Sequence, residues 1–177
     1  ENTAQYCLAG VVDRGTVENC WSSSDITISG GYDYLSVGGI AGGMHSGGMI
    51  KNCYFAGTAT GIKVAAGICG WGQGHYEGYV GQIYNCFNMG QLVAETKYAI
   101  GRYSKNITAT NQARAMYNNY YFDSSCTAYS WSRGNTLVSK GQLGSGYLAY
   151  ILDKNSTLGG SPVWSQGALF PELRKTA

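Results

Sequence analysis

Few residues of this 177-residue chain could do acid–base or metal chemistry, and they stand far apart in the sequence. The chain contains two histidines and ten acidic residues, and the closest two acids are five residues apart. The sequence therefore shows neither a calcium-binding loop nor the carboxylate pair of a glycoside hydrolase. It also lacks HExxH, GxSxG, GxGxxG and P-loop motifs, so no motif supports a protease, a serine hydrolase or a nucleotide-binding enzyme.

The two histidines nevertheless occupy comparable places, because each follows a Gly-Ile segment by a few residues, and Asp13 stands in a similar position. Loops that follow equivalent strands should line one edge of a repeat structure, where Asp13, His45 and His75 could meet. The functional interpretation is a polar and aromatic ridge that holds a ligand, and the alternative is a set of solvated loop residues. The predicted ligand-binding residues are His45, Trp71, His75, Tyr76, Tyr103 and Trp131. We predict no catalytic residue, metal ligand or cofactor.

Three of the six cysteines, Cys20, Cys53 and Cys86, recur at the same offset of the repeat described next. An odd number cannot pair off completely, and stacked Cβ vectors run parallel, so we expect reduced, buried thiols that act as small apolar side chains. Cys7, Cys69 and Cys126 occupy other offsets, and a disulfide among them stays open. The sequence contains no CxxC motif, which would have suggested a zinc or redox site.

The elements that must position these residues are repeats of about 33 residues. The pattern aliphatic–x–Asn–Cys–aromatic recurs as Val17 to Trp21, Ile50 to Tyr54 and Ile83 to Phe87, and as Met116 to Tyr120 with Asn119 in place of the cysteine. A Gly-Ile type segment precedes each pattern, and a polar–apolar–polar segment such as Thr58-Ala59-Thr60 follows the first three. Three short strand-like segments in each unit, rich in Gly and poor in helix formers, predict a parallel β-helix.

In such a fold, equivalent side chains stack about 4.8 Å apart and form ladders. We predict a right-handed parallel β-helix of about four coils, with the right hand following from strand twist. Strict alternation would put Val17 and Cys20 on opposite faces. An Asn in the left-handed conformation between them would reset the alternation, so that both point inward and the asparagines bond from coil to coil. The aromatic ladder Trp21, Tyr54, Phe87 and Tyr120 is then either core or an exposed strip.

The residues Gly39-Ile40-Ala41-Gly42 through Ile50-Lys51-Asn52-Cys53-Tyr54 resemble the GLUG-type repeat of bacterial cell-surface proteins. Such repeats occur in adhesins and in the non-catalytic N-terminal region of IgA-specific metallopeptidases. The resemblance covers residues 8–122 and implies an extracellular or cell-surface location. A short helix, Trp164 and the Pro-containing segment Phe170 to Leu173 also resemble the end of these arrays. Repeat motifs indicate architecture better than activity.

We expect three regions: β-helix repeats over 1–125, a connection over 126–136 and a C-terminal cap over 137–177. Ser139 to Gln142 have capping-box spacing, and Leu143, Tyr147 and Ile151, with Leu148 and Leu152, form one face of a helix that Gly144 and Gly146 weaken. We expect this segment to cover the last coil, because a bare end would expose edge strands. The first residues show neither a cap nor a signal peptide, so we expect upstream coils of the same protein.

Composition limits the partners. A net charge of +2 without basic clusters argues against nucleic acid, and no apolar run is long enough to insert into a membrane. The leading hypothesis is a non-enzymatic extracellular module of a bacterial surface protein, either adhesive or a spacer. The first alternative is a module that binds a host or dietary glycan or a host surface protein. The second alternative is a fragment of a polysaccharide lyase or of a metallopeptidase.

Overall fold

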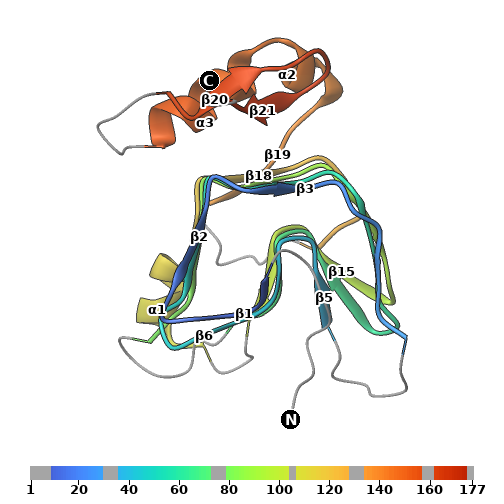
Figure 1. Ribbon diagram of the computed structural model, residues 1–177, viewed down its shortest axis with the longest axis vertical. Coiled ribbons are helices and arrows are strands. Elements are labelled where there is room, and N and C mark those ends of the chain that lie inside the picture. Colours follow the sequence, from blue (N-terminus) through green and yellow to red (C-terminus); the bar gives the residue numbers. More distant parts are fainter. Residues whose placement is uncertain are drawn as a thin grey trace.

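Short parallel strands, each stacked on the equivalent strand of a neighbouring repeat, make up most of the regular secondary structure (Figure 1). The computed structural model describes residues 9–29, 36–72, 79–103, 107–127, 134–156 and 162–174. Within these residues the chain passes repeatedly through five sheets, which we name A to E in the order in which the chain first enters them. All strands within each of these five sheets are parallel. The prediction of an all-β fold built from stacked parallel strands is therefore confirmed.

The five sheets contain three to five strands each. Sheet A consists of β1 (Ala9–Asp13), β6 (Ala41–His45), β11 (Cys69–Gly72) and β16 (Gly101–Tyr103), and sheet B of β2 (Thr16–Glu18), β7 (Met49–Lys51), β12 (Gln82–Tyr84) and β17 (Met116–Tyr117). Sheet C consists of β3 (Trp21–Ser22), β8 (Tyr54–Phe55), β13 (Phe87–Asn88), β18 (Asn119–Tyr121) and β19 (Asn135–Leu137). Sheet D consists of β4 (Ile26–Thr27), β9 (Thr58–Thr60) and β14 (Gln91–Val93), and sheet E of β5 (Ser36–Gly38), β10 (Val64–Ala66) and β15 (Thr96–Tyr98).

An asparagine stands at every corner between sheets B and C. Asn19, Asn52, Asn85 and Asn118 have φ between 51° and 54°, in the left-handed region that Asn tolerates better than most residues. The Nδ2 of Asn52 donates to Oδ1 of Asn19 at 3.2 Å, and the Nδ2 of Asn85 donates to Oδ1 of Asn52 at 2.7 Å. The predicted Asn bend and its bonding from coil to coil are thus confirmed for the first three asparagines, whereas Asn118 is exposed.

The corner sets which side chains fill the interior. Ile50, Ile83 and Met116 stack in register and are at most 1% exposed, as predicted, and Val17 continues the column partly exposed. On the other side of the corner, Cys53 and Cys86 are also completely buried.

Asn119 takes the place of the missing cysteine in β18. Its Oδ1 accepts from the backbone N–H of Cys86 at 3.0 Å, and its Nδ2 donates to the carbonyl of Ile83 at 2.9 Å. The cysteine ladder therefore ends on the side-chain amide of Asn119, whose oxygen and nitrogen are both hydrogen-bonded.

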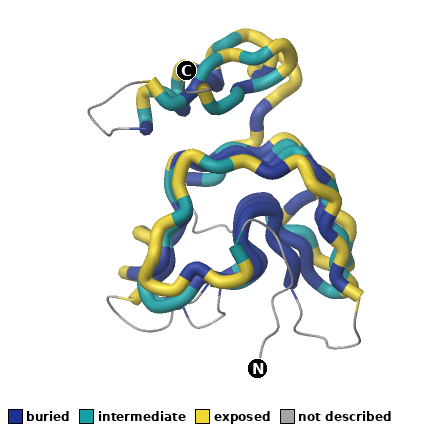
Figure 2. The backbone as a smooth tube through the Cα atoms, viewed as in Figure 1, coloured by how far each residue is buried: buried dark blue, intermediate teal, exposed yellow. Residues whose placement is uncertain are grey.

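Each full unit contains one strand in each of five sheets, so the prediction of three strands per unit is wrong. The predicted Gly-Ile segment Ala9 to Val11 lies in β1, whereas Gly39-Ile40 and Gly67-Ile68 form turns between sheets E and A. The buried Ile40, Ile68 and Ile100 project from these turns into the core, and Figure 2 shows that this bend of the backbone is buried. A Cβ added to Gly39 would lie 2.2 Å from the ring of Phe55. The glycine is needed because the backbone passes directly over a core aromatic ring.

The aromatic ladder of sheet C points away from the interior. Trp21 is 52% exposed and stacks on Tyr54, with ring centroids 5.7 Å apart and planes 7° from parallel. Tyr54 and Phe87 are nevertheless buried, because they form a second apolar cluster with Leu148, Leu152, Trp164 and other residues of the C-terminal segment. The ladder was predicted to be either core or an exposed strip, and each alternative is partly right. The ladder faces outward, but the C-terminal segment covers most of it.

The C-terminal segment contains α2 (Lys140–Gly144), α3 (Tyr147–Asn155) and an antiparallel hairpin of β20 (Trp164–Gln166) and β21 (Pro171–Leu173). The predicted capping box of Ser139 and Gln142 is present. The expected helix is divided at Gly146, which has a φ of 78°. Tyr147, expected on the apolar face, is 57% exposed, whereas Leu143, Leu148 and Leu152 are buried.

This segment lies along the outer side of sheet C rather than over the last coil (Figure 1). It contacts Tyr54 of β8, Phe87 of β13 and Tyr120 of β18, which belong to three successive levels of the stack. The expectation that it covers the last coil is therefore not met. The outward aromatic column is the physical reason, because it offers the segment an apolar surface to bury.

Beyond the last copies of the repeat, other residues extend two of the sheets. β19 pairs with β18 at the end of sheet C, and Thr127 forms a parallel bridge with Tyr98 of β15. Helix α1 (Ala109–Ala115), which joins sheets A and B after β16, was not predicted from the sequence. Its signal was Thr108, whose side chain accepts from the backbone N–H of Asn111 at the helix start.

The asparagine corner makes a stability prediction with an internal control. Asn85→Ala removes the donor to Asn52 Oδ1 and to the carbonyl of Leu152, leaving buried acceptors unpaired at a cost of about 1–3 kcal/mol. Asn118→Ala suffers only the left-handed penalty of about 1–2 kcal/mol, which both variants share. Urea denaturation should show Asn85→Ala to be the less stable variant. Equal losses would refute a stabilising ladder.

Two tryptophans that contact the same tyrosine test how the segment is held. Trp164 is 1% exposed and its ring lies 6.1 Å from that of Tyr54, whereas Trp21 is half exposed. Trp164→Ala should lower the free energy of unfolding by about 3–5 kcal/mol, since it leaves a cavity in a buried cluster. Trp21→Ala should cost far less. The difference would be measured by thermal and urea unfolding, and a similar loss in both would contradict the docked position of the segment.

Candidate ligand-binding surface

The outer side of sheet A brings together two of the predicted site residues. β1, β6 and β11 run in parallel register, with Asp13 opposite His45 and Trp71 opposite Gly43. The rings of His45 and Trp71 are in tilted contact, with centroids 4.9 Å apart and planes at 48°. Both side chains are partly exposed, so an imidazole and an indole form one continuous surface there.

Gly43 leaves a gap in this surface. It stands between Val11 and Trp71, its Cα partners on the two neighbouring strands, and Val11 is 52% exposed. A Cβ at Gly43 would lie 3.7 Å from the Trp71 carbonyl oxygen and 3.9 Å from the His45 ring, which are ordinary contact distances. The position could therefore hold a side chain in ordinary contact with both neighbours, although Gly43 itself is buried between them.

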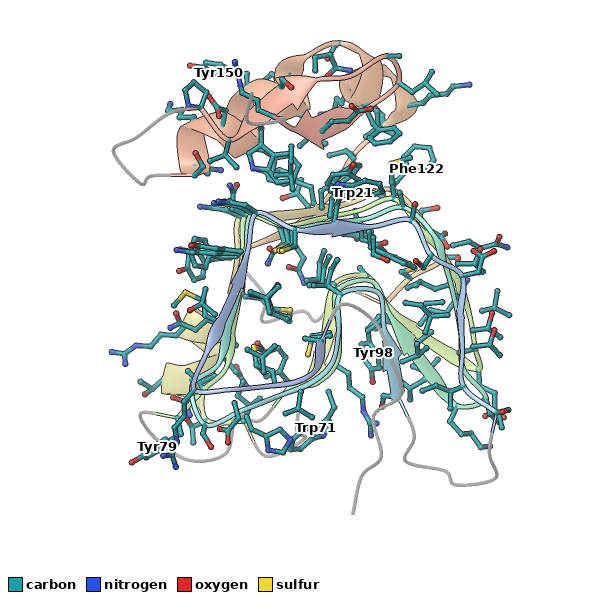
Figure 3. The ribbon with its side chains drawn as sticks, viewed as in Figure 1. Trp21, Trp71, Tyr79, Tyr98, Phe122 and Tyr150 are labelled. Atoms are coloured by element: carbon teal, nitrogen blue, oxygen red, sulfur yellow. The ribbon has the colours of Figure 1, made fainter. Side chains whose placement is uncertain are left out.

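The chain turns sharply where this surface ends. Arg14, Ser46 and Gly47 all have positive φ, so the loops after β1 and β6 bend away from the sheet in similar ways. The backbone N–H of Gly47 donates to the carbonyl of Tyr79 at 3.1 Å, which ties this turn to the next repeat. Tyr79 is 54% exposed, and Figure 3 shows it and Trp71 on the outer side of sheet A.

Of the other predicted site residues, the structure describes Tyr103, and that residue does not join this surface. Tyr103, expected in an exposed loop, is 2% exposed and its hydroxyl donates to the carbonyl of Gly81 at 2.7 Å, so that prediction is wrong. Its ring fills the interior space that its register partner Gly72 leaves free. His75, Tyr76 and Trp131 lie outside the described residues.

The side chains of this surface can make both stacking contacts and hydrogen bonds. An indole face can pack against the apolar face of a ring, while His45 and Asp13 offer hydrogen-bonding groups beside it. Over the described residues, no three His, Cys, Asp or Glu side chains are close enough to hold a metal ion.

A second ladder runs along the outer side of sheet B. It begins with an ion pair between Glu18 and Lys51 and continues through Tyr84 and Tyr117, whose rings stack with centroids 4.9 Å apart and planes 4° from parallel. The hydrogen bond to Glu18 raises the pKa of Lys51. The Glu18 side chain of the pair is exposed, whereas that of Lys51 is largely covered, so the ladder forms a partly buried, patterned surface.

A pocket of about 230 Å³, which the sequence analysis missed, lies in the C-terminal segment. Its lining includes Tyr150 and Asp153 of α3, Ser165 and Gln166 of β20, and Arg174. The local signal was the spacing of Tyr150 and Asp153, which puts both on one side of a helix. The pairing of that helix with Arg174 depends on the hairpin and could not be read from the sequence.

The cysteines show no feature of a reactive site. Cys20, Cys53, Cys69, Cys86 and Cys126 are free thiols. The contact with Cys53, followed by burial, raises the pKa of Cys20, while burial and the neighbouring Asp123 raise the pKa of Cys126 to about 12. Reactive cysteines have lowered pKa values, so the raised pKa of Cys20 fits its predicted role as apolar filler. Cys69 and Cys126, for which a disulfide had been left open, are both thiols rather than members of a disulfide. Cys20, which was expected to be buried, is half-buried in the first strand level.

Comparisons with known proteins leave the family open. No protein-family model matches the chain, and searches of curated proteins and of solved structures found no similar protein. Among the described helices, none combines the length and the apolar character needed to cross a bilayer.

The thiols yield a prediction with a defined pH dependence. With the pKa of Cys126 raised from 9.0 to about 12, its thiolate fraction at pH 8 is about 1,000-fold below that of an ordinary thiol. Iodoacetamide at pH 8 should therefore leave Cys126 of the native protein unmodified and alkylate it after denaturation, as mass spectrometry would show. Because the folded pKa lies above the unfolded one, stability should fall as the pH rises above about 9. Rapid labelling of Cys126 in the native protein would contradict this.

Proposed function

We propose that this chain is a non-catalytic module of an extracellular bacterial surface protein, where it serves as an adhesive or spacer scaffold. In this proposal the stacked strands form a right-handed parallel β-helix of about four coils that belongs to a longer array of GLUG-type repeats. The C-terminal segment would protect the array along its side. The proposal rests on the sequence resemblance and on one structural observation, the continuous ladders.

The ladders support a scaffold because each repeat contacts mainly its neighbours. Ile50, Ile83 and Met116 stack through the interior, while hydrogen-bonded asparagines join the first corners. A structure held by such neighbour contacts can be lengthened by adding repeats without redesigning the core. That property suits a spacer that holds another domain at a distance.

A second candidate, glycan binding, is favoured by the contact between His45 and Trp71. Both rings are partly exposed and Asp13 is the register partner of His45, so a sugar ring could pack on the indole while Asp13 and His45 bond to its hydroxyl groups. This candidate is compatible with the adhesive form of the first.

Location provides the direct test of the scaffold proposal. An antibody raised against the purified chain should label intact cells of the bacterium that produces it, and external protease should remove the labelling. A cytoplasmic protein probed in parallel controls for cell lysis. Labelling that appears only after the cells are permeabilised would refute an extracellular module.

A further inference from the structure

We propose that the pocket between α3 and β20 binds a single sugar ring. The inference goes beyond the scaffold role, and it concerns a site separate from the surface around Trp71. The volume of about 230 Å³ is below the roughly 300–1,000 Å³ of drug-sized sites, so the pocket suits one ring rather than an oligomer.

The charged groups of the pocket are held by the backbone of the hairpin. Oδ1 of Asp153 accepts from the N–H groups of Val163 at 2.7 Å and Trp164 at 2.9 Å. Nε of Arg174 donates to the carbonyl of Trp164 at 3.0 Å. One edge of each charged group is therefore held by hydrogen bonds before any ligand binds. This reduces the conformational entropy that the two side chains would lose on binding.

The other edges of these side chains remain available. In the part of the chain that the structure describes, Oδ2 of Asp153 and the terminal nitrogens of Arg174 make no hydrogen bond or ion pair. Gln166 uses its Nε2 to donate to the carbonyls of Leu143 and Gly167, which leaves Oε1 as an acceptor. The pocket thus offers acceptors and donors together.

That mixture selects the class of ligand. The carboxylate of Asp153 would repel a simple anion, and the guanidinium of Arg174 would repel a simple cation. For either ion, this repulsion would offset part of the attraction to the oppositely charged side chain. A sugar hydroxyl both donates and accepts, and neighbouring hydroxyls can bond to a carboxylate and a guanidinium at once. The geometry therefore favours a neutral polyhydroxylated ring over either ion.

An aromatic side chain completes the site. Tyr150 is 63% exposed and lines the pocket, and Figure 3 shows it on the side of the segment that faces away from sheet C. An exposed aromatic ring beside fixed polar groups can cover the apolar face of a sugar. Gly146, at the start of α3, lines the same pocket without a side chain.

The same helix provides a matched control. Tyr147 is 57% exposed and does not line the pocket, so Tyr147→Ala and Tyr150→Ala remove the same side chain from similar exposure. Saturation-transfer NMR would use the full chain with the methyl glycosides of glucose, galactose, mannose and N-acetylglucosamine at about millimolar concentration. At least one should receive saturation, with affinity at least about tenfold weaker in Tyr150→Ala and in Arg174→Gln and unchanged in Tyr147→Ala.

Three outcomes would overturn the proposal. They are an absence of transfer to all four glycosides, unchanged binding in Tyr150→Ala, and tighter binding of the zwitterion glycine than of any sugar. A loss of transfer in Trp71→Ala but not in Tyr150→Ala would assign the sugar to the surface of sheet A, so the pocket would fail and the glycan-binding candidate would stand. Far-UV circular dichroism confirms that each variant is folded. Labelling of intact cells tests the scaffold independently of all these results.

Discussion

The left-handed asparagine at the corner between sheets B and C is the constraint on which the rest of the structure depends. In a regular strand, Ile50 and Cys53 would point to opposite faces, because they are three residues apart. The positive φ of Asn52 turns the chain so that both are buried, and its amide joins the neighbouring corners. An L-residue without a short polar side chain would meet the steric penalty there and supply no bond. One residue therefore sets both the shape of the coil and its attachment to the next coil.

The same turn creates the need for the C-terminal segment. With Cys53 and Phe55 directed inward, Tyr54 must point outward, and Phe87 follows it one repeat later. An outward column of aromatic rings in water would be an exposed apolar patch of the kind that promotes association. Helix α3 and the hairpin cover this column, and Asn85 bonds to the carbonyl of Leu152 at 2.8 Å. The corner ladder and the covering segment are thus physically connected.

The sequence was most informative where a residue type recurs at a fixed offset. The asparagine bends, the column of Ile50 and Ile83, and the capping box at Ser139 could all be predicted, because each depends on local chemistry. The Gly-Ile turns could not, since Gly39 is required by the distant ring of Phe55. Tyr103 was missed for a similar reason: its burial depends on Gly72 one level away. The side position of the C-terminal segment required knowing which way the aromatic ladder points.

Both candidate binding surfaces lie where the repeat is interrupted. Gly43 replaces the side chain that its neighbours Val11 and Trp71 carry, and the pocket at Asp153 and Arg174 belongs to a segment outside the repeats. This follows from the physics of stacking, because a side chain that repeats in every coil is used to pack against its own copies. Groups left free for another molecule can arise only where the ladder has a gap or ends. The repeat can therefore keep a constant scaffold while irregular positions, such as those of the C-terminal segment, vary the surface.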